Sequence, residues 1–347
     1  MRRLPLLALC LVAACRDAVP PNPSAQWLST ADEERAATIV AEGRRVADSV
    51  SDPVVAAEIR ASIPDRKDFS DSVHYHRALD RVRVTVEVAR GGVPRDALGR
   101  YYPAATPHLA WARIAGKGLH FQPVNSVQHV IYPVPKPWDK PVDTLLAVGE
   151  ALWAYRVPTR LATGKTVPMW EYDFPHTSGG VSVDAPWHSG MAQGYALMLF
   201  AENYRHTGLQ IWRARAYAVL PTLMTSWDSG GVRLPDTTAG YWFEEFHPRV
   251  QVFNGAAHVA LHVGVAARDF ADDPALARIA QRADAAILTA APRYDDGRWT
   301  LYSLTQGWNT QTYHDMHIAL MRELAAQTGD ARFTAFADKW AAYVRPY

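Results

Sequence analysis

Two adjacent carboxylates stand in the stretch "YWFEEFHP", which runs from Tyr241 to Pro248. Glu244 and Glu245 lie there among four Tyr, Trp and Phe residues. If the stretch is extended, the two side chains point to opposite faces, so that one is solvated while the other faces an aromatic cleft. Poor solvation raises the pKa of a carboxyl group and suits it to exchange a proton near neutral pH. The pattern therefore predicts a general acid or base, and it fits a solvated glutamate pair in a surface loop equally well.

Phenol and imidazole groups form a second candidate cluster. "YDDGRWTLYSL" ends with an alternation typical of a strand and carries Tyr302, while "QTYHDMHIALM" begins a helix that carries Tyr313, His314 and His317. Tyr313 and His317 are four residues apart, so they share a helix face on which a phenol can donate a proton beside a histidine. Tyr302 alone fits a structural strand residue as well. The histidine spacing differs from the HExxH zinc motif, so we expect neither a metal nor a cofactor.

The composition of the 347 residues is that of an ordinary globular protein, with 48% hydrophobic and 20% charged residues. A formal net charge of +1 gives no reason to expect a nucleic-acid partner. The 12 Trp and 15 Tyr either fill the core or stack on sugar rings. The chain contains no G-x-S-x-G elbow, no P-loop and no G-x-G-x-x-G fingerprint, which argues against several common enzyme classes.

The first residues predict export. "MRRLPLLALCLVAAC" has two arginines followed by an apolar run too short to span a bilayer, as in a secretory signal peptide over residues 1–14. Small residues before Cys15 match a bacterial lipobox, so we expect a lipid on Cys15, a Pro-rich tether over residues 15–30, and a domain anchored to the membrane of the cell envelope, at the periplasmic face or the cell surface. An ordinary cleaved signal peptide is the alternative. Loss of Cys10 and lipidation of Cys15 would leave no thiol for disulfides, zinc or nucleophilic catalysis.

Helical periodicity dominates the remainder, so we expect a mainly α fold. A helical and irregular N-terminal segment over residues 31–140 should precede the main domain, residues 141–347. Serial helix pairs favour an (α/α) toroid or barrel, or an open bundle, with short β inserts that carry the site. "RVRVTVEVAR", residues 81–90, alternates and fits a strand as well as a helix. The predicted helices cover residues 31–50, 70–90, 144–163, 189–207, 210–227, 250–270, 273–290, 311–328 and 331–344.

Several motifs occur together in one order: "PWHSGMAQG", "GGV", "YWFEEFHP", "VFNG", "YDDGRWTLYSL" and "YHDMHIALM", from about Pro186 to Met321. In this order and spacing they resemble the C-terminal domain of the D-glucuronyl C5-epimerase family, which acts on heparosan. The resemblance implies an (α/α) catalytic domain over residues 141–347, a cleft for an acidic polysaccharide, and copies that can pair as a homodimer. It also implies catalytic roles for Glu245, Tyr302 and Tyr313.

The resemblance has two departures. Phe246 stands where the family often has Tyr, and Thr305 where it often has Arg. The missing cation could be supplied by Arg249 or Arg298. The predicted substrate-binding residues are Trp187, His188, Gln193, Tyr241, Asn254, His314 and His317.

The glycines of "HSGMAQG" raise a separate question, because Gly190 and Gly194 each cost a helix roughly 1 kcal/mol relative to Ala. Our hypothesis is that they let a sugar chain approach a helix N-terminus capped by Ser189, where backbone N–H groups bind a uronate carboxylate. Trp187 would then stack on a ring and Gln193 would bind hydroxyls. The alternative is that both glycines serve tight helix packing.

The reaction implied is inversion at C5 of a uronate, from D-glucuronate to L-iduronate in a heparosan-like polymer. One group removes the C5 proton and another returns a proton to the opposite face, while the carbanion charge spreads into the carboxylate. We assign Glu245 and Tyr313 to the two faces, with Tyr302 assisting and His314 or His317 tuning a phenol. Two alternatives stay open: a polysaccharide lyase that uses the same carbanion, and a non-catalytic carbohydrate-binding lipoprotein.

Overall fold

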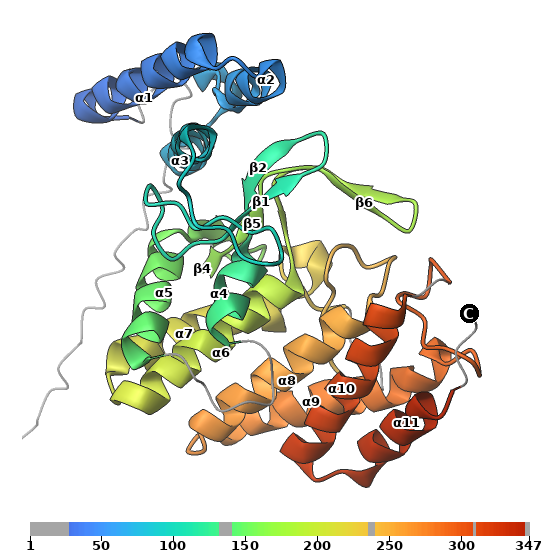
Figure 1. Cartoon of the computed structure of the whole chain (residues 1–347). Coiled ribbons are helices and arrows are strands. Elements are labelled where there is room, and N and C mark those ends of the chain that lie inside the picture. Colours follow the sequence, from blue (N-terminus) through green and yellow to red (C-terminus); the bar gives the residue numbers. More distant parts are fainter. Residues whose placement is uncertain (1–27, 132–140, 235–239, 308–309, 344–347) are drawn as a thin grey trace, which may run out of the picture.

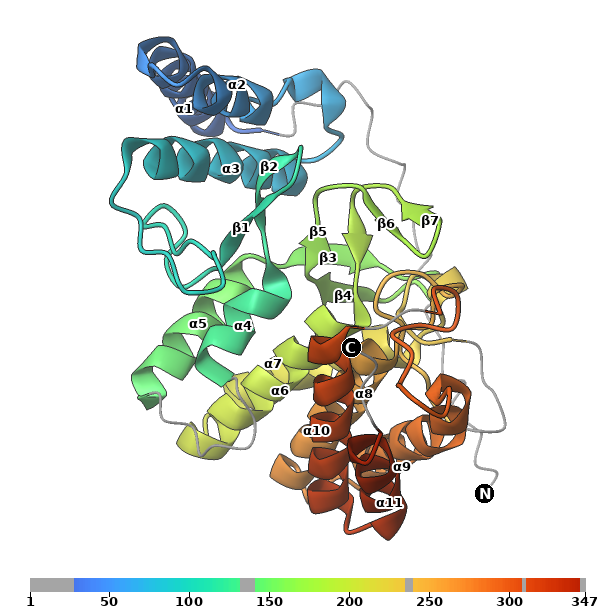
Figure 2. The ribbon, with the colours of Figure 1, turned by 45° about the vertical axis from the view of Figure 1, so that its right-hand side comes forward.

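The computed structural model describes residues 28–131, 141–234, 240–307 and 310–343 (Figure 1). The predicted signal peptide, Cys15 and most of the tether lie outside these residues. The fold is mainly helical, as predicted, with short two-stranded β pieces. Three N-terminal helices lie on one side of the molecule and a larger body of helices forms the remainder, with most of the short strands gathered between them (Figure 2).

The N-terminal helices are α1 (Thr30–Ser49), α2 (Pro53–Ser62) and α3 (Ser72–Arg90), followed by a hairpin of β1 (Trp111–Ile114) and β2 (Gly118–Phe121). Residues 81–90 are helical, so the strand alternative is wrong. The alternation has a physical cause, because α3 is buried on two sides. Val82 and Val86 pack against α1 and α2, whereas Val84 joins the main core.

The body contains α4 (Pro123–Ile131), α5 (Val142–Ala154), α6 (Gly190–Thr207), α7 (Gln210–Met224), α8 (Phe253–Asp269), α9 (Pro274–Ala290), α10 (Gln311–Thr328) and α11 (Ala331–Ala341). Helix α6 packs against α4, α5, α7 and α8, while α8 also contacts α9 and α10. The helices therefore pack in series, as predicted, but these contacts do not establish closure into a toroid.

Short antiparallel pairs complete the fold: β3 (Val157–Arg160) with β4 (Thr166–Met169), β5 (Glu171–Tyr172) with β8 (Trp187–His188), and β6 (His176–Ser178) with β7 (Val181–Val183). The helix expected over residues 144–163 ends at Ala154, and β3 follows, because Pro158 cannot donate the N–H that a helix interior needs. The strand expected around Tyr302 is reduced to isolated bridges, among them Val252 with Ser303.

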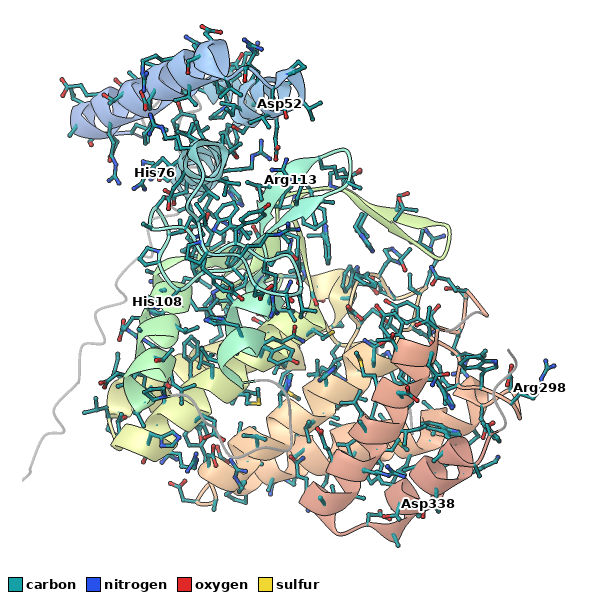
Figure 3. All side chains as sticks on the ribbon, in the orientation of Figure 1. Asp52, His76, His108, Arg113, Arg298 and Asp338 are labelled. Carbon is teal, nitrogen blue, oxygen red and sulfur yellow. The ribbon has the colours of Figure 1, made fainter. Side chains whose placement is uncertain are left out.

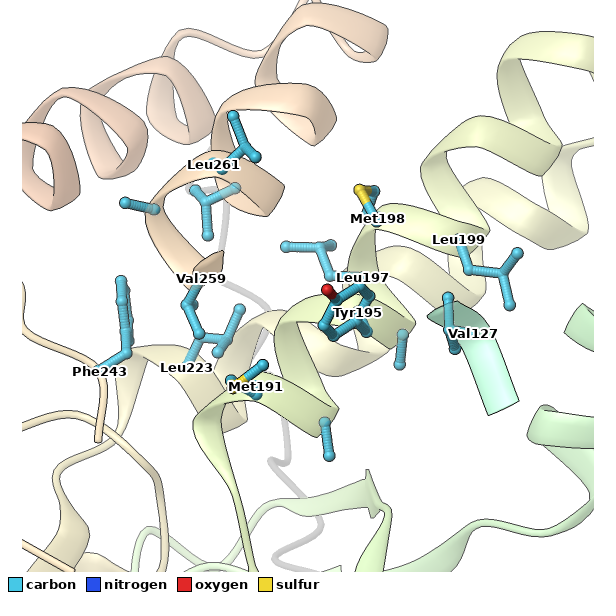
Figure 4. Close-up of a cluster of buried hydrophobic side chains, with 14 of the residues drawn as sticks. Val127, Met191, Tyr195, Leu197, Met198, Leu199, Leu223, Phe243, Val259 and Leu261 are labelled. Carbon is cyan, nitrogen blue, oxygen red and sulfur yellow. The ribbon is translucent and has the colours of Figure 1, made fainter. Parts of the chain in front are cut away.

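Helices α6, α7 and α8 meet in the core, where Met191 of α6 lies near Leu223 of α7 and Val259 of α8 (Figure 4). A Cβ on Gly194 would lie 3.2 Å from a methyl group of Val259 and 3.4 Å from its Cα. Gly194 therefore serves close helix packing, as in the alternative explanation, and our sugar-approach hypothesis is wrong for this residue.

Candidate active site

The two glutamates lie on a loop that is attached to the N-terminus of α6. The N–H of Glu244 donates to Val232 O at 2.8 Å, and its carbonyl oxygen accepts a 2.8 Å hydrogen bond from the N–H of Gly190. A Cβ on Gly190 would lie 2.6 Å from that carbonyl oxygen. Gly190 is therefore required for contact with the glutamate loop. The hypothesis that it opens the helix N-terminus to a sugar is wrong, since its N–H already has a partner.

Glu244 anchors the loop. Its side chain is completely buried, and its carboxylate accepts hydrogen bonds from the backbone N–H groups of Glu245 at 3.0 Å and Val252 at 3.3 Å, and from the Trp242 indole at 3.3 Å. Burial raises the pKa of Glu244 to about 7, against the opposing effect of these donors. The expectation that one glutamate is solvated is wrong. Glu244 is held inside because it bonds three otherwise unpaired donors of its own loop.

Glu245 is the member of the pair whose carboxyl group has an unpaired buried oxygen among the described residues. Its Oε2 is buried and has no hydrogen-bond partner within the described parts of the chain. Burial raises the pKa of Glu245 to about 8, and the neighbouring charge of Glu244 acts in the same direction. A Cβ on Gly255 of α8 would lie 2.7 Å from both Cβ and Oε2 of Glu245. The carboxyl group is thus pressed against the first turn of α8, in the protonation range that suits a general acid or base.

Two phenols lie beside this carboxyl group. The rings of Tyr302 and Tyr313 are 4.6 Å apart and pack in one small cluster with Val250 and Phe246. Burial raises the pKa of both tyrosines, the charge of Glu245 raises it further, and a hydrogen bond links the two phenols. The structure therefore brings the three predicted catalytic side chains together from separate elements: the loop before α8, the loop before α10, and the first turn of α10.

A third phenol, Tyr172 of β5, was missed by the sequence analysis. It is buried, and its pKa is raised by burial and then by the charge of Glu245. The backbone of Val124, in the first turn of α4, hydrogen-bonds the Tyr172 hydroxyl. The cluster of aromatic and acidic residues in "WEYDFP" was an available signal. A two-residue strand has no periodicity, however, and the approach of Tyr172 to Glu245 is a long-range contact.

Trp187 of β8 lies within a cluster of aromatic side chains that includes Tyr172. The indole is 6% exposed, stacks on Tyr172 at 4.2 Å, and is surrounded by Phe174, His176 and Phe246. Its N–H donates to Phe174 O at 2.7 Å. The prediction that Trp187 stacks on a sugar is not supported, because its ring is packed against other aromatic rings.

Three further predicted binding residues have partners within the protein. Gln193 is fully buried and donates to Trp170 O at 3.2 Å, so it cannot reach substrate hydroxyls. His188 is half-buried, and its Nε2 lies 3.2 Å from Gly231 O. The ring of Tyr241 is covered by two guanidinium groups, those of Arg233 at 4.8 Å and Arg282 at 4.1 Å. The prediction of sugar contacts is wrong for Gln193, and it stays a prediction for His188 and Tyr241.

His314 and His317 are buried and hydrogen-bond the segment that precedes Tyr302. The Nδ1 atom of His314 accepts the Thr300 N–H at 3.2 Å, and Nε2 lies 3.2 Å from Trp340 O. His317 Nδ1 lies 2.8 Å from the Thr300 hydroxyl, and burial lowers the His317 pKa to about 3. Because both rings are buried, the prediction that they bind substrate is wrong, whereas the prediction that one of them tunes a phenol stays a prediction. They fix the segment before Tyr302 to α10.

Asn254 lies next to the residue that contacts Glu245. It precedes Gly255 in the first turn of α8, is 5% exposed, and its buried Oδ1 has no partner within the described ranges. The helix begins after Val252, whose side chain cannot cap it. The positive end of the α8 dipole thus lies beside the Glu245 carboxyl group, where it favours nearby negative charge.

Both arginines expected to supply the missing cation are exposed. Arg298 is exposed and projects away from the molecule (Figure 3), so the prediction that it replaces the missing cation is wrong. Arg249 is also exposed. Thr305, where the family often has Arg, makes a 3.4 Å contact with Val250 O. The sequence analysis missed another cation, Lys117, in the β1–β2 turn. Burial lowers the pKa of His176, and the charge of Lys117 lowers it further. The His176 ring in turn lies 4.6 Å from the ring of Phe246.

The portions that the structure describes include no cluster of three or more His, Cys, Asp or Glu residues arranged to hold a metal ion. No helix among them combines the length and the apolarity required to cross a membrane.

Comparisons with known proteins place these residues in context. The model of the D-glucuronyl C5-epimerase C-terminus matches residues 164–342, just over half of the chain. A D-glucuronyl C5-epimerase from Caenorhabditis elegans is 24% identical over 180 residues, which cover 45% of this chain and 29% of that protein. An uncharacterised protein from Methanocaldococcus jannaschii is 24% identical over 180 residues, 50% of this chain and 58% of its own length. The chain thus spans less than two thirds of either relative.

Proposed function

Since this chain belongs to the D-glucuronyl C5-epimerase C-terminal family, we propose that it is an isomerase that inverts C5 of a uronate in an acidic polysaccharide. The specific reaction proposed is conversion of D-glucuronate to L-iduronate in a heparosan-like polymer. The observation that carries the proposal is the buried, unpartnered Oε2 of Glu245 beside the phenols of Tyr302 and Tyr313.

The reaction needs a proton acceptor and a proton donor on opposite faces of C5. In its ionised form the Glu245 carboxylate takes the C5 proton, and the electron pair of the broken C–H bond spreads into the uronate carboxylate. Tyr313 then donates its phenolic proton to the other face, and Tyr302 stabilises the resulting phenolate through the hydrogen bond between the two hydroxyls. The reverse reaction uses the same groups with their roles exchanged.

Charge on the substrate carboxylate must be balanced during this step. The N-terminus of α8 offers a partial positive charge at the position of Asn254 and Gly255. Lys117 supplies a full positive charge near His176 and over the Phe174 ring. Both features support the proposal, because they offer the positive charge that the family often supplies with an arginine at the position of Thr305.

Deuterium exchange tests the proposal. The protein from residue 28 onward is incubated in D2O with heparosan, and C5–H is followed by NMR together with the ultraviolet absorbance of unsaturated uronates. Deuterium at C5, a new iduronate signal and no absorbance are expected. Rising absorbance would make the protein a lyase that uses the same carbanion, and binding without either signal would leave a carbohydrate-binding protein.

We also propose that the protein is exported and lipid-anchored through Cys15, since the apolar run after two arginines ends in "VAAC". Metabolic labelling with a fatty acid is expected to mark the wild type and not Cys15→Ser. Equal labelling of both would contradict the anchor.

A further inference from the structure

A row of polar side chains runs along the buried face of α8. Between Phe253 and Ala267 the polar side chains of this helix are those of Asn254, His258 and His262, which follow one another at intervals of four residues. All three are buried. Residues four apart share a helix face, so the three groups form one stripe. Polar groups in an apolar core cost free energy of folding unless they have partners, so this stripe calls for a reason.

The stripe begins beside Glu245. Asn254 precedes Gly255, on which a Cβ would lie 2.7 Å from Oε2 of Glu245. Oε2 of Glu245 and Oδ1 of Asn254 are both buried and have no hydrogen-bond partner among the described residues. His258 lies one turn further along α8, with its Cβ roughly 5–6 Å from that of Asn254. A water molecule spans a gap of this size, and here it would find the polar partners that a buried water needs.

Helix α10 leads from Tyr313 to the same histidine. It packs against α8 (Figures 1 and 2). His317, four residues after Tyr313, shares its helix face, and the buried Nε2 of His317 has no hydrogen-bond partner in the part of the chain that the structure describes. Burial lowers the pKa of His317, and the charges of His314 and His258 lower it further, which places the His317 and His258 rings within electrostatic reach of each other. The polar groups of both helices therefore converge on His258.

His258 has contacts that fix its ring and a cavity that brings solvent near it. Its Nδ1 lies 3.5 Å from the Tyr195 hydroxyl, which accepts a 3.0 Å hydrogen bond from the side-chain amide of Gln128. Burial lowers the pKa of His258 to about 4, so the ring is neutral at pH 7 and has one nitrogen that accepts a proton and one that donates. The ring lines a cavity of about 530 Å³ that it shares with Leu98, a residue 77% exposed, so the cavity reaches the surface.

The proposed inversion leaves the site in the wrong protonation state for a second turnover. Glu245 ends with the proton taken from C5, and Tyr313 ends without the proton that it gave to the opposite face. Another glucuronate reacts only after Glu245 has lost one proton and Tyr313 has gained one. Because Oε2 of Glu245 is buried, bulk solvent does not exchange that proton directly. The proton therefore needs a path through the protein.

We propose that Asn254, His258 and His317, with bridging water, form a proton relay that resets Glu245 and Tyr313 between turnovers. The inference rests on the proposed function. The relay breaks no bond of the substrate: one proton leaves Glu245, one reaches Tyr313, and the cavity beside His258 exchanges both with solvent. The relay residues act on the reaction only through Glu245 and Tyr313.

The first turnover separates the relay from the chemistry. His258→Phe removes both ring nitrogens, and His262→Phe, one turn further from Glu245 on the same buried stripe, is the matched control. Iduronate formed from heparosan is measured per enzyme molecule by rapid quench. His258→Phe should form about one iduronate per enzyme at the wild-type rate and then continue about tenfold or more slowly, because the first inversion uses protons already in place. Dissolved imidazole, a small proton carrier, should restore the later turnovers. His262→Phe should show neither the burst nor the rescue.

The other outcomes contradict the relay. Equal slowing of the first and later turnovers in His258→Phe would refute it, and so would an unchanged steady rate. If His258→Phe does not fold by circular dichroism, His258→Gln gives the same comparison, since an amide keeps a polar side chain but does not take up a proton. Exchange of C5–H by the wild type without a burst in these variants refutes the relay alone. If the wild type exchanges no C5–H, the proposed function fails, and the relay fails with it.

Discussion

Replacing Gly255 by Ala should displace the Glu245 carboxyl group while leaving Glu245 itself unchanged. The added Cβ would lie 2.7 Å from both Cβ and Oε2 of Glu245. Normal contact between such atoms is about 3.5–4.0 Å, so the two groups must separate by about 1 Å. Because the contact includes Glu245 Cβ, rotation of the carboxylate alone does not relieve it, and the loop must shift. A displacement of about 1 Å costs on the order of 100-fold in rate.

The same substitution should change stability little. Ala in a helix gains about 1 kcal/mol over Gly, and overpacking costs about 1–3 kcal/mol. The expected net loss is therefore about 0–2 kcal/mol. Gly194→Ala is the matched control, since it adds a methyl group to another buried helix position whose nearest contacts are Val259 and His262.

The assay is the initial rate of C5 deuterium exchange, together with urea denaturation of the same variants. Gly255→Ala should lose about 100-fold in rate, whereas Gly194→Ala should stay within a few-fold of the wild type at comparable stability. A Gly255→Ala protein that exchanges at the wild-type rate would refute the placement of Glu245 at the reaction centre.

Other consequences follow from the same geometry. Tyr313→Phe should lower the exchange rate about 10²–10⁴-fold with unchanged circular dichroism, and an unaffected rate would remove this phenol from the mechanism. The wild-type exchange rate should rise with pH through about 8, as Glu245 loses its proton, and a falling rate in that range would contradict its role as base. The folded-state pKa of Glu245 lies above the unfolded value of 4.5, so the stability that the protonated form provides is lost as pH rises from about 4.5 to 8. Glu245→Gln cannot ionise, so its free energy of unfolding should exceed that of the wild type by a few kcal/mol near pH 8. Urea denaturation near pH 4.5 and pH 8 measures this difference. A stability difference that is the same at both pH values would argue against the raised pKa. Thr300→Val should cost about 1–3 kcal/mol by removing the hydroxyl partner of the buried His317 Nδ1, while the backbone hydrogen bond to His314 and the exchange rate per folded molecule are retained.

Local signals in the sequence predicted much of the helical body. Ser189 and Thr310 cap α6 and α10 as their side chains suggest, and Asp273 caps α9. The alternation in residues 81–90 could not distinguish a strand from a helix, because a helix buried on two sides does not show a single apolar stripe. Periodicity reports which positions are buried, and it does not report how many layers bury them.

The candidate catalytic side chains could be named from motifs that resemble the family, but their partners in the fold could not be predicted. Trp187 and Gln193 carry groups suited to sugar binding, yet their nearest partners belong to the protein itself. Tyr172, which feels the charge of Glu245, is held in place by the pairing of β5 with β8 just before α6. Such contacts join segments far apart in the chain, and no local pattern encodes them.

Proton exchange at C5 in D2O is the most direct test of the central claim, that Glu245 and the phenols of Tyr302 and Tyr313 form a site for uronate inversion. The account predicts deuterium at C5 and an iduronate signal with the wild type, no unsaturated product, and loss of both signals in Glu245→Gln and Tyr313→Phe. Undiminished exchange in both variants would contradict it.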